Sequence, residues 1–144
     1  KGEINMSNKE KFEGFKKEHL KKNEEKYGKE IRDKYGKKTI EESNKKFLNM
    51  SKEDFDEMSR TEEKVFNGLI EIYETQDINS EVAREIYENH KKWLSFTWPN
   101  YSKEAHMGLA EMYVADERFA KYYNDKAGKE VVNILRDIII KYAK

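Results

Sequence analysis

The segment VVNILRDIIIKY, residues 131–142, is the most apolar stretch of the sequence and the one that decides its fold. Its apolar residues recur at intervals of three and four, which is the period of an amphipathic α-helix. A helix face this apolar must be buried against other elements, so we expect it to form the centre of a helical core. The predicted core face consists of Val131, Val132, Leu135, Ile138, Ile139 and Tyr142.

Helical signals continue upstream of this segment. The chain has one proline in 144 residues and almost no alternating β-type runs, so we predict an all-α fold of about five to seven helices. The Trp98-Pro99-Asn100 turn ends one helix, because the residue before a proline is displaced from the helical conformation. The predicted N-terminal caps of the later helices are Ser51, Ser80, Ser102, Asp116 and Asp125.

The first third of the chain is polar and basic. Ser7 and Glu10 form a capping box that starts a helix. We expect that helix to stop near Gly28, with a short segment over 29–35 and a polar stretch through Lys46. Residues 1–46 carry 15 Lys/Arg against 10 Asp/Glu, whereas residues 47–144 carry 14 against 19. With only nine large apolar residues, residues 1–46 cannot offset the entropy of ordering by themselves. We therefore predict an under-packed segment over 1–46 and a helical core over 47–144.

Composition excludes several classes of protein. Charged residues make up 40% of the sequence and apolar residues 36%, and no apolar run approaches the length of a membrane span. The chain has no cysteine, which removes disulfides, thiolate metal sites and cysteine nucleophiles. We expect a soluble, cytoplasmic domain. The lysines alternate with glutamates and form no groove-reading motif, which disfavours nucleic-acid binding by this chain.

The residues that carry catalysis in other proteins form no recognisable pattern here. There is no nucleophile elbow and no glycine-rich phosphate loop, so we predict no catalytic residues, no cofactor and no enzyme. His90 and His106 flank the Trp98-Pro99 turn, and antiparallel packing of their helices would bring the two side chains together. Two interpretations stay open: hydrogen bonding inside a helix–helix contact, or a haem or metal site.

An aromatic cluster surrounds the same turn. Amphipathic rings gathered around a helix break are typical of a cleft that stacks on flat ligands, although the same rings also serve as core fillers in a domain poor in aliphatic residues. If they form a cleft, we expect its ligand-binding residues to be Trp93, Phe96, Trp98, Tyr101, His106, Tyr113, Phe119 and Tyr123.

Several motifs resemble the TipAS antibiotic-recognition domain, the C-terminal effector part of TipA-like regulators of the MerR family. The most specific is the run from Met112 to Phe119, which reads MYVADERF. Weaker matches extend from residue 23 to residue 144. The resemblance implies a globin-like helical arrangement with a deep surface cleft and an N-terminal lid that becomes ordered when a ligand binds. It also implies a thiopeptide-like antibiotic or another hydrophobic multi-ring drug as ligand, and transcription regulation as the context.

Two departures from the family pattern qualify this expectation. Some members capture thiopeptides covalently through a cysteine, and this chain has none, so we expect reversible binding. These 144 residues also contain no helix-turn-helix and no dimerising coiled coil. The chain is therefore either an effector domain, with DNA binding and dimerisation supplied by a longer regulator, or a stand-alone drug-sequestering protein. We expect Asp116 to be a helix cap and Arg118 to be its ion-pair partner.

Overall fold

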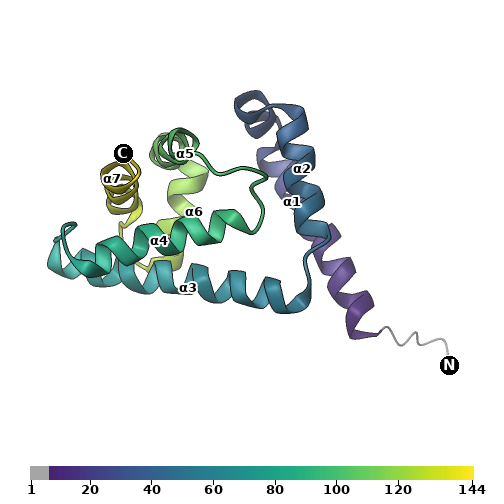
Figure 1. Ribbon diagram of the computed structural model, residues 1–144, viewed down its shortest axis with the longest axis horizontal. Helices are drawn as coiled ribbons and strands as arrows, with labels where there is room; N and C mark the ends of the chain where they lie inside the picture. Colours follow the sequence, from purple (N-terminus) through teal and green to yellow (C-terminus); the bar gives the residue numbers. More distant parts are fainter. Residues whose placement is uncertain (1–6) are drawn as a thin grey trace. The chain divides into compact units, whose positions relative to one another are not determined.

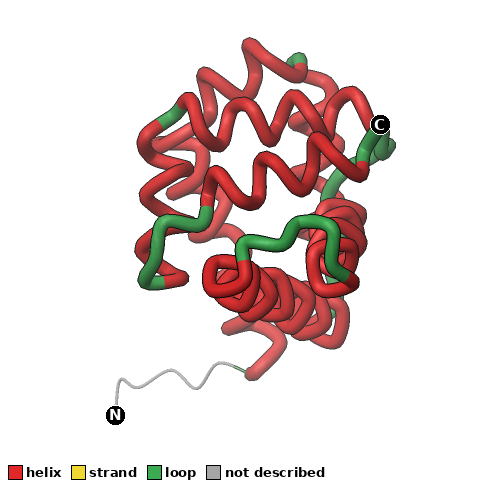
Figure 2. The backbone as a smooth tube through the Cα atoms, turned by 90° about the vertical axis from the view of Figure 1, so that its left-hand side faces the viewer, coloured by secondary structure: helices red, strands yellow, loops and turns green. Residues whose placement is uncertain are grey.

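The computed structural model describes residues 7–144 and contains seven α-helices within that range, joined by short loops (Figures 1 and 2). The described residues include no β-strand, which confirms the all-α prediction. Residues 1–6, the start of the predicted 1–46 segment, lie outside the described range. The helices are α1 (Asn8–Tyr35), α2 (Lys37–Leu48), α3 (Lys52–Thr75), α4 (Glu81–Ser95), α5 (Lys103–Ala115), α6 (Glu117–Ala127) and α7 (Val132–Tyr142).

The chain divides into two compact units. The first consists of the chain up to Phe55 together with the loop Phe96–Pro99, and the second consists of Asp56–Ser95 and Asn100–Lys144. The division falls within the first turn of α3, so this helix contributes to both units. The predicted boundary at residue 46 stays a prediction.

Helix α7 is the centre of the second unit, as its apolar stripe predicts. It packs against α4 and α5, and α6 packs against α5 and α7. The side chain of Leu135 has no exposed surface, and Tyr142 is half-buried with its hydroxyl donating to the Ile78 carbonyl over 2.8 Å. The aliphatic core of this unit includes Val65, Leu69, Ile72, Ile86, Leu94, Val131, Leu135, Ile138 and Ile139.

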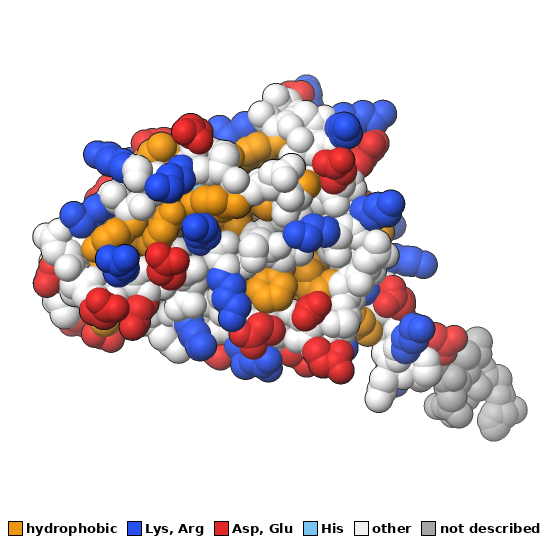
Figure 3. All heavy atoms as spheres, in the orientation of Figure 1, with side chains coloured by type: hydrophobic (Ala, Val, Ile, Leu, Met, Phe, Trp, Pro, Cys, Tyr) orange, Lys and Arg blue, Asp and Glu red, His pale blue; other side chains and the backbone are white. Residues whose placement is uncertain are grey.

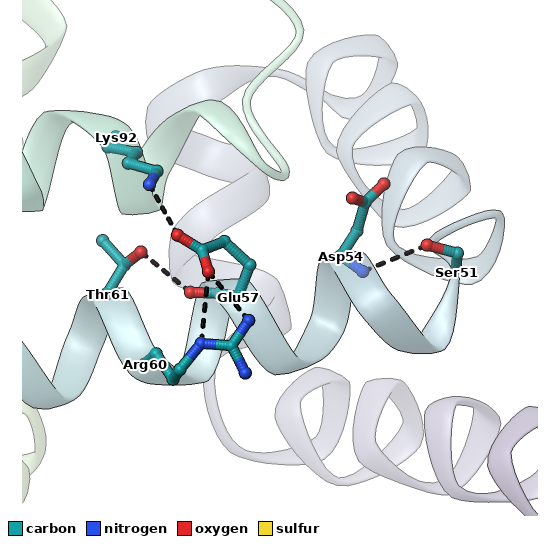
Figure 4. Close-up of polar contacts among 6 residues, drawn as sticks. All are labelled: Ser51, Asp54, Glu57, Arg60, Thr61 and Lys92. Carbon is teal, nitrogen blue, oxygen red and sulfur yellow. Dashed lines mark hydrogen bonds and ion pairs between the residues drawn. The ribbon is translucent and has the colours of Figure 1, made fainter.

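Most of the predicted caps are confirmed. The capping box at Ser7 and Glu10 has both of its hydrogen bonds, and Ser102 accepts from the N–H of Ala105 over 3.0 Å. The Ser51 hydroxyl accepts from the N–H of Asp54 over 3.0 Å at the start of α3 (Figure 4).

One predicted cap is wrong. Asp125 does not cap α7. Instead it forms an ion pair with Lys121, and the amide oxygen of Asn124 accepts from the N–H groups of Val131 and Val132 at 2.7 and 3.0 Å. The amide is the better placed acceptor because Asn124 lies half-buried at the end of α6, whereas Asp125 is exposed.

Two predictions for the first unit are also wrong. Helix α1 does not stop near Gly28 but runs through to Tyr35, and the expected polar stretch is mostly the helix α2. Glycine inside a helix costs only about 1 kcal/mol. Here the bidentate ion pair of Arg32 with Glu24 spans Gly28 and stabilises the continuous helix. The chain reverses instead at Gly36, whose φ of 89° is readily adopted by glycine.

A buried lysine fixes α1 against the end of α2. Lys16 is 1% exposed, and its ammonium donates to the carbonyls of Leu48 at 2.6 Å and Met50 at 2.8 Å. It also forms an ion pair with Glu13 at 3.1 Å and lies 4.5 Å from the centre of the Phe12 ring. A buried ammonium needs such partners, because desolvation of an unpaired charge is strongly unfavourable. Lys16 therefore holds the junction between α2 and α3 in place.

Charged side chains cover the surface and also join helices. On the face shown in Figure 3, acidic and basic side chains are interspersed, with apolar side chains visible between them. In the second unit, Lys92 of α4 and Arg60 of α3 converge on the Glu57 carboxylate at 2.7 and 2.8 Å (Figure 4). These two cations lower the pKa of Glu57 to about 2.

No helix in the described part of the chain is long and apolar enough to cross a membrane.

Gly68 marks a close approach of α3 to α4, and we expect alanine there to destabilise the second unit. A Cβ at this position would lie 2.6 Å from Cγ1 of Ile86, whose side chain is only 1% exposed and has little room to move. The clash, at about 1–3 kcal/mol, outweighs the helical gain of about 1 kcal/mol. Urea unfolding followed by circular dichroism measures the difference. Gly14→Ala is the control, because a Cβ there meets nothing within 4 Å. Equal stabilisation by both substitutions would contradict the close approach.

Candidate functional site

A buried pair of histidines joins α4 to α5. Nδ1 of His90 and Nε2 of His106 lie 2.8 Å apart, and the two rings are stacked with centroids 5.0 Å apart. The side chains are 1% and 0% exposed. The predicted approach of these two residues around the proline-containing turn is therefore confirmed.

Three tyrosine hydroxyls extend this pair into a hydrogen-bonded chain. Tyr101 contacts Nδ1 of His106 at 2.7 Å, and Tyr87 contacts Tyr101 at 2.9 Å. At the other end, Tyr113 contacts Nε2 of His90 at 3.3 Å. With both imidazoles neutral, a single direction of donation satisfies each of these contacts, either from Tyr113 towards Tyr87 or in reverse. The chain therefore accommodates two neutral histidines without an unpaired ring nitrogen.

Burial keeps both imidazoles neutral. Desolvation lowers the pKa of His106 to about 4, with a smaller contribution from the nearby Lys91 ammonium. Desolvation lowers the pKa of His90 well below its ordinary value, and the neighbouring His106 adds to the effect. The phenol of Tyr101 has a raised pKa, because burial and the hydrogen bond to Tyr87 both disfavour its ionised form. At neutral pH the site is thus an uncharged polar chain inside an aromatic environment.

The structure brings six of the eight predicted ligand-binding residues into one connected group of rings in the second unit. The polar chain already joins three of them, Tyr101, His106 and Tyr113. The ring centroid of Trp93 lies 5.5 Å from that of His90. The ring centroid of Tyr113 lies 4.8 Å from that of Tyr123 and 5.7 Å from that of Phe119. The six residues are Trp93, Tyr101, His106, Tyr113, Phe119 and Tyr123.

Exposure differs within this group. Trp93, Tyr101 and Phe119 are half-buried, whereas the side chains of His106, Tyr113 and Tyr123 are at most 3% exposed. The half-buried rings are directly accessible to a ligand. The three buried ones can be reached only if neighbouring side chains move.

The other two predicted residues, Phe96 and Trp98, belong to the first unit. Both are half-buried. The Trp98 ring lies 6.3 Å from the ring of Tyr35, and its carbonyl accepts from the Lys46 ammonium over 3.0 Å. The buried hydroxyl of Tyr35 has no hydrogen-bond partner, and burial raises its pKa to about 12. The eight residues predicted to bind ligand are thus divided between the two units.

Asp116 and Arg118 have the structural roles predicted for them. Asp116 caps α6 by accepting from the backbone N–H of Arg118 at 2.9 Å, and it forms an ion pair with the guanidinium of the same residue at 2.7 Å. Both groups are therefore engaged with each other at the junction of α5 and α6.

The polar chain leaves little for a metal ion or haem to bind. Both ring nitrogens of His90 and both of His106 lie within hydrogen-bond distance of a neighbour. No group of three or more His, Cys, Asp or Glu side chains in the described residues is arranged to hold a metal ion. His19, the third histidine, is exposed on α1.

The first unit also contains a pocket of about 790 Å³ that no sequence motif predicts. Its walls come from the first two turns of α1 and from the junction of α2 with α3. Phe55 contacts Phe12 and Phe15 edge-on, with ring centroids 5.5 and 5.4 Å apart. The helical stripe of Phe12 and Phe15 was a visible signal, but their partner lies some 40 residues further along the chain and carries no motif. The remaining lining residues are Asn8, Lys9, Lys11, Glu13, Met50, Ser51 and Lys52.

An all-helical chain whose aromatic side chains gather around a neutral polar chain is a candidate small-molecule-binding domain. Comparison with known families agrees with this class: residues 27–142 match the family described as the TipAS antibiotic-recognition domain. The chain belongs to this family. No curated protein and no solved structure matches it.

Proposed function

We propose that this chain reversibly binds large hydrophobic multi-ring drugs of the thiopeptide antibiotic kind. The observation that carries the proposal is the family match, which covers 116 residues from 27 to 142. Antibiotic recognition is what the family is described as doing, and the extension to thiopeptide-like ligands is our inference. The clustered rings of the second unit support it, because flat heterocycles stack well on amphipathic aromatic side chains.

The eight predicted residues are the proposed ligand contacts. Trp93, Tyr101 and Phe119 offer half-buried rings, and the hydroxyl of Tyr101 adds a polar group that can orient a ligand. Trp98 offers an indole and Tyr35 an unpartnered hydroxyl beside it. The sequence has no cysteine, so a thiol cannot capture the ligand covalently, and binding is proposed to be non-enzymatic and reversible.

We further propose that residues 1–46 act as a lid that becomes more ordered when the ligand binds. The polar composition of this segment supports the idea, because few apolar contacts stabilise it in the absence of a ligand. In a longer MerR-type activator, ligand-dependent ordering would bias the DNA-bound state, and dimerisation would be supplied by the regulator. As a stand-alone protein, the same domain would sequester the drug in the cytoplasm.

Calorimetry and amide exchange with a thiopeptide antibiotic test this proposal. A ligand present at a hundred times its Kd stabilises the folded protein by about 2.7 kcal/mol, so we expect a higher melting temperature. We also expect slower amide exchange in residues 8–46, because the proposed ordering of the lid would protect its amides. If neither quantity changes with a thiopeptide or with other hydrophobic multi-ring drugs, the proposal is wrong.

A pair of variants locates the contacts. Trp93→Ala removes a half-buried ring of the proposed site and is expected to weaken binding at least tenfold, as for aromatic residues at the centre of other interfaces. Tyr73→Ala removes an exposed ring that belongs to α3, outside the proposed site, and should bind like the unmodified protein. Equal affinities of the two variants would remove Trp93 from the site.

A further inference from the structure

The pocket of the first unit has a cationic rim. Lys9, Lys11 and Lys52 line it. Glu13 is the one acidic residue among the described residues that line it, and its carboxylate forms an ion pair with the buried Lys16 at 3.1 Å. Lysine side chains therefore outnumber acidic ones in the lining by three to one.

Two helices also begin at this pocket. Asn8 and Lys9 belong to the first turn of α1, while Ser51 and Lys52 form the start of α3. The N-terminal end of a helix carries partial positive charge, which favours an anion nearby. Both ends are already capped, by the Ser7–Glu10 box and by Ser51, and Glu10, Glu53 and Asp54 lie in the two first turns. The cationic character of the pocket therefore comes from its lysine side chains alone.

The pocket is exposed, and a buried lysine links its two walls. Phe15 is 46% exposed, which is unusual for a large apolar side chain in this structure. The wall opposite α1 is held by Lys16 through the carbonyls of Leu48 and Met50. This link between the two walls lowers the entropic cost of binding, because it limits how far they can separate.

The α1 wall lies outside the region that matches the family. Its lining residues run from Asn8 to Phe15, whereas the match begins at residue 27. The family match therefore covers one wall of the pocket, formed by Met50, Ser51, Lys52 and Phe55, and not the other.

We propose that this pocket is a separate site for planar aromatic anions, such as a one- to three-ring carboxylate. The rings would stack on Phe12, Phe15 and Phe55, while the carboxylate faces the ammonium groups of Lys9 and Lys11. A cationic ligand or an uncharged apolar ligand would lack the attraction between a carboxylate and the lysine ammonium groups. The inference does not depend on the proposed antibiotic site.

Titration of the full chain with 2-naphthoate, followed by NMR and isothermal calorimetry, tests the proposal. A ligand of this size is expected to bind with a Kd of roughly 0.1–1 mM and to shift the amide signals of residues 8–15 and 50–55. The neutral isostere 2-naphthamide should bind roughly tenfold more weakly, and added salt should narrow that difference. Equal binding of the two compounds, or shifts confined to the second unit, would overturn the proposal.

Variants then separate the apolar and charged contributions. Phe15→Ala and the double variant Lys9→Gln/Lys11→Gln are each expected to weaken naphthoate binding about fivefold or more. All three side chains are exposed, so the variants should fold. Tyr73→Ala and Lys17→Gln are the matched controls outside the pocket and should bind normally. Unchanged naphthoate affinity in both test variants would show that naphthoate does not bind in this pocket.

Two further measurements distinguish this proposal from self-association of the chain and from the antibiotic proposal. If sedimentation shows a dimer that Phe15→Ala dissociates, the pocket is a self-association surface and the proposal is wrong. Thiopeptide stabilisation of the same variants distinguishes the two sites: we expect Phe15→Ala to lose naphthoate binding and to keep the thiopeptide effect. Failure of the antibiotic proposal alone would leave naphthoate binding intact.

Discussion

Lowering the pH from 7 to 5 is expected to destabilise the second unit through its buried histidines. An unfolded chain protonates each imidazole near pH 6.5, whereas in the folded protein the pKa of His106 is lowered to about 4. Below pH 6.5 the unfolded state therefore binds more protons, so stability falls as the pH falls, and the contribution of His106 levels off near pH 4. For His106 the loss between pH 7 and 5 is about 2 kcal/mol. His90, whose pKa is lowered for the same reason, adds a loss of the same sign.

Urea unfolding at pH 7, 6 and 5, followed by circular dichroism, measures this dependence. His106→Gln keeps a hydrogen-bonding side chain but cannot titrate, so its stability should fall less steeply with pH than that of the unmodified protein. His19→Gln is the matched control, because it removes the exposed histidine of the first unit. If His106→Gln keeps the full pH dependence, the paired imidazoles are not its source.

Replacing Lys16 with methionine is expected to destabilise the first unit by about 3 kcal/mol. The substitution keeps an apolar stem of similar length but removes the ammonium. The carbonyls of Leu48 and Met50 would then lose a charged donor, and a hydrogen bond to a charged group contributes about 1.5–3 kcal/mol. Because this unit has few buried apolar side chains, the loss is a large fraction of its stability.

Hydrogen exchange followed by mass spectrometry resolves this effect by region. Lys16→Met should exchange faster than the unmodified protein over residues 8–55, and the α7 amides should be unchanged. Lys17→Met makes the same chemical change at an exposed neighbouring position and should behave like the unmodified protein. Identical exchange in the two variants would show that the buried ammonium contributes nothing to stability.

Features encoded locally could be predicted from the sequence. A cap depends on residues two or three positions apart, and this local signal predicts the caps at Ser7, Ser102 and Asp116. The α7 stripe predicted the core for the same reason, because its period alone defines a buried face. The approach of His90 to His106 followed from two helices joined by a proline-containing turn.

Features that depend on distant parts of the chain could not be predicted. Lys16 reads as one more solvated lysine on a polar helix, and its burial depends on carbonyls 32 and 34 residues away. The ion pair that spans Gly28 in α1 joins residues eight positions apart, a contact that no cap signal reports. Likewise, the hydrogen bond that joins Tyr87 to the polar chain is formed with Tyr101, 14 residues away, and no local signal predicts it.

The division of the chain into two units also separates its two indoles. Trp93 belongs to the second unit and Trp98 to the first, and the sequence contains no other tryptophan. Replacing either one with phenylalanine leaves a single indole, which can be excited selectively over the nine tyrosines and lies in one unit. With the emission of each single-tryptophan variant recorded during a ligand titration or a denaturant ramp, the responses of the first and second units can be followed separately without any attached label.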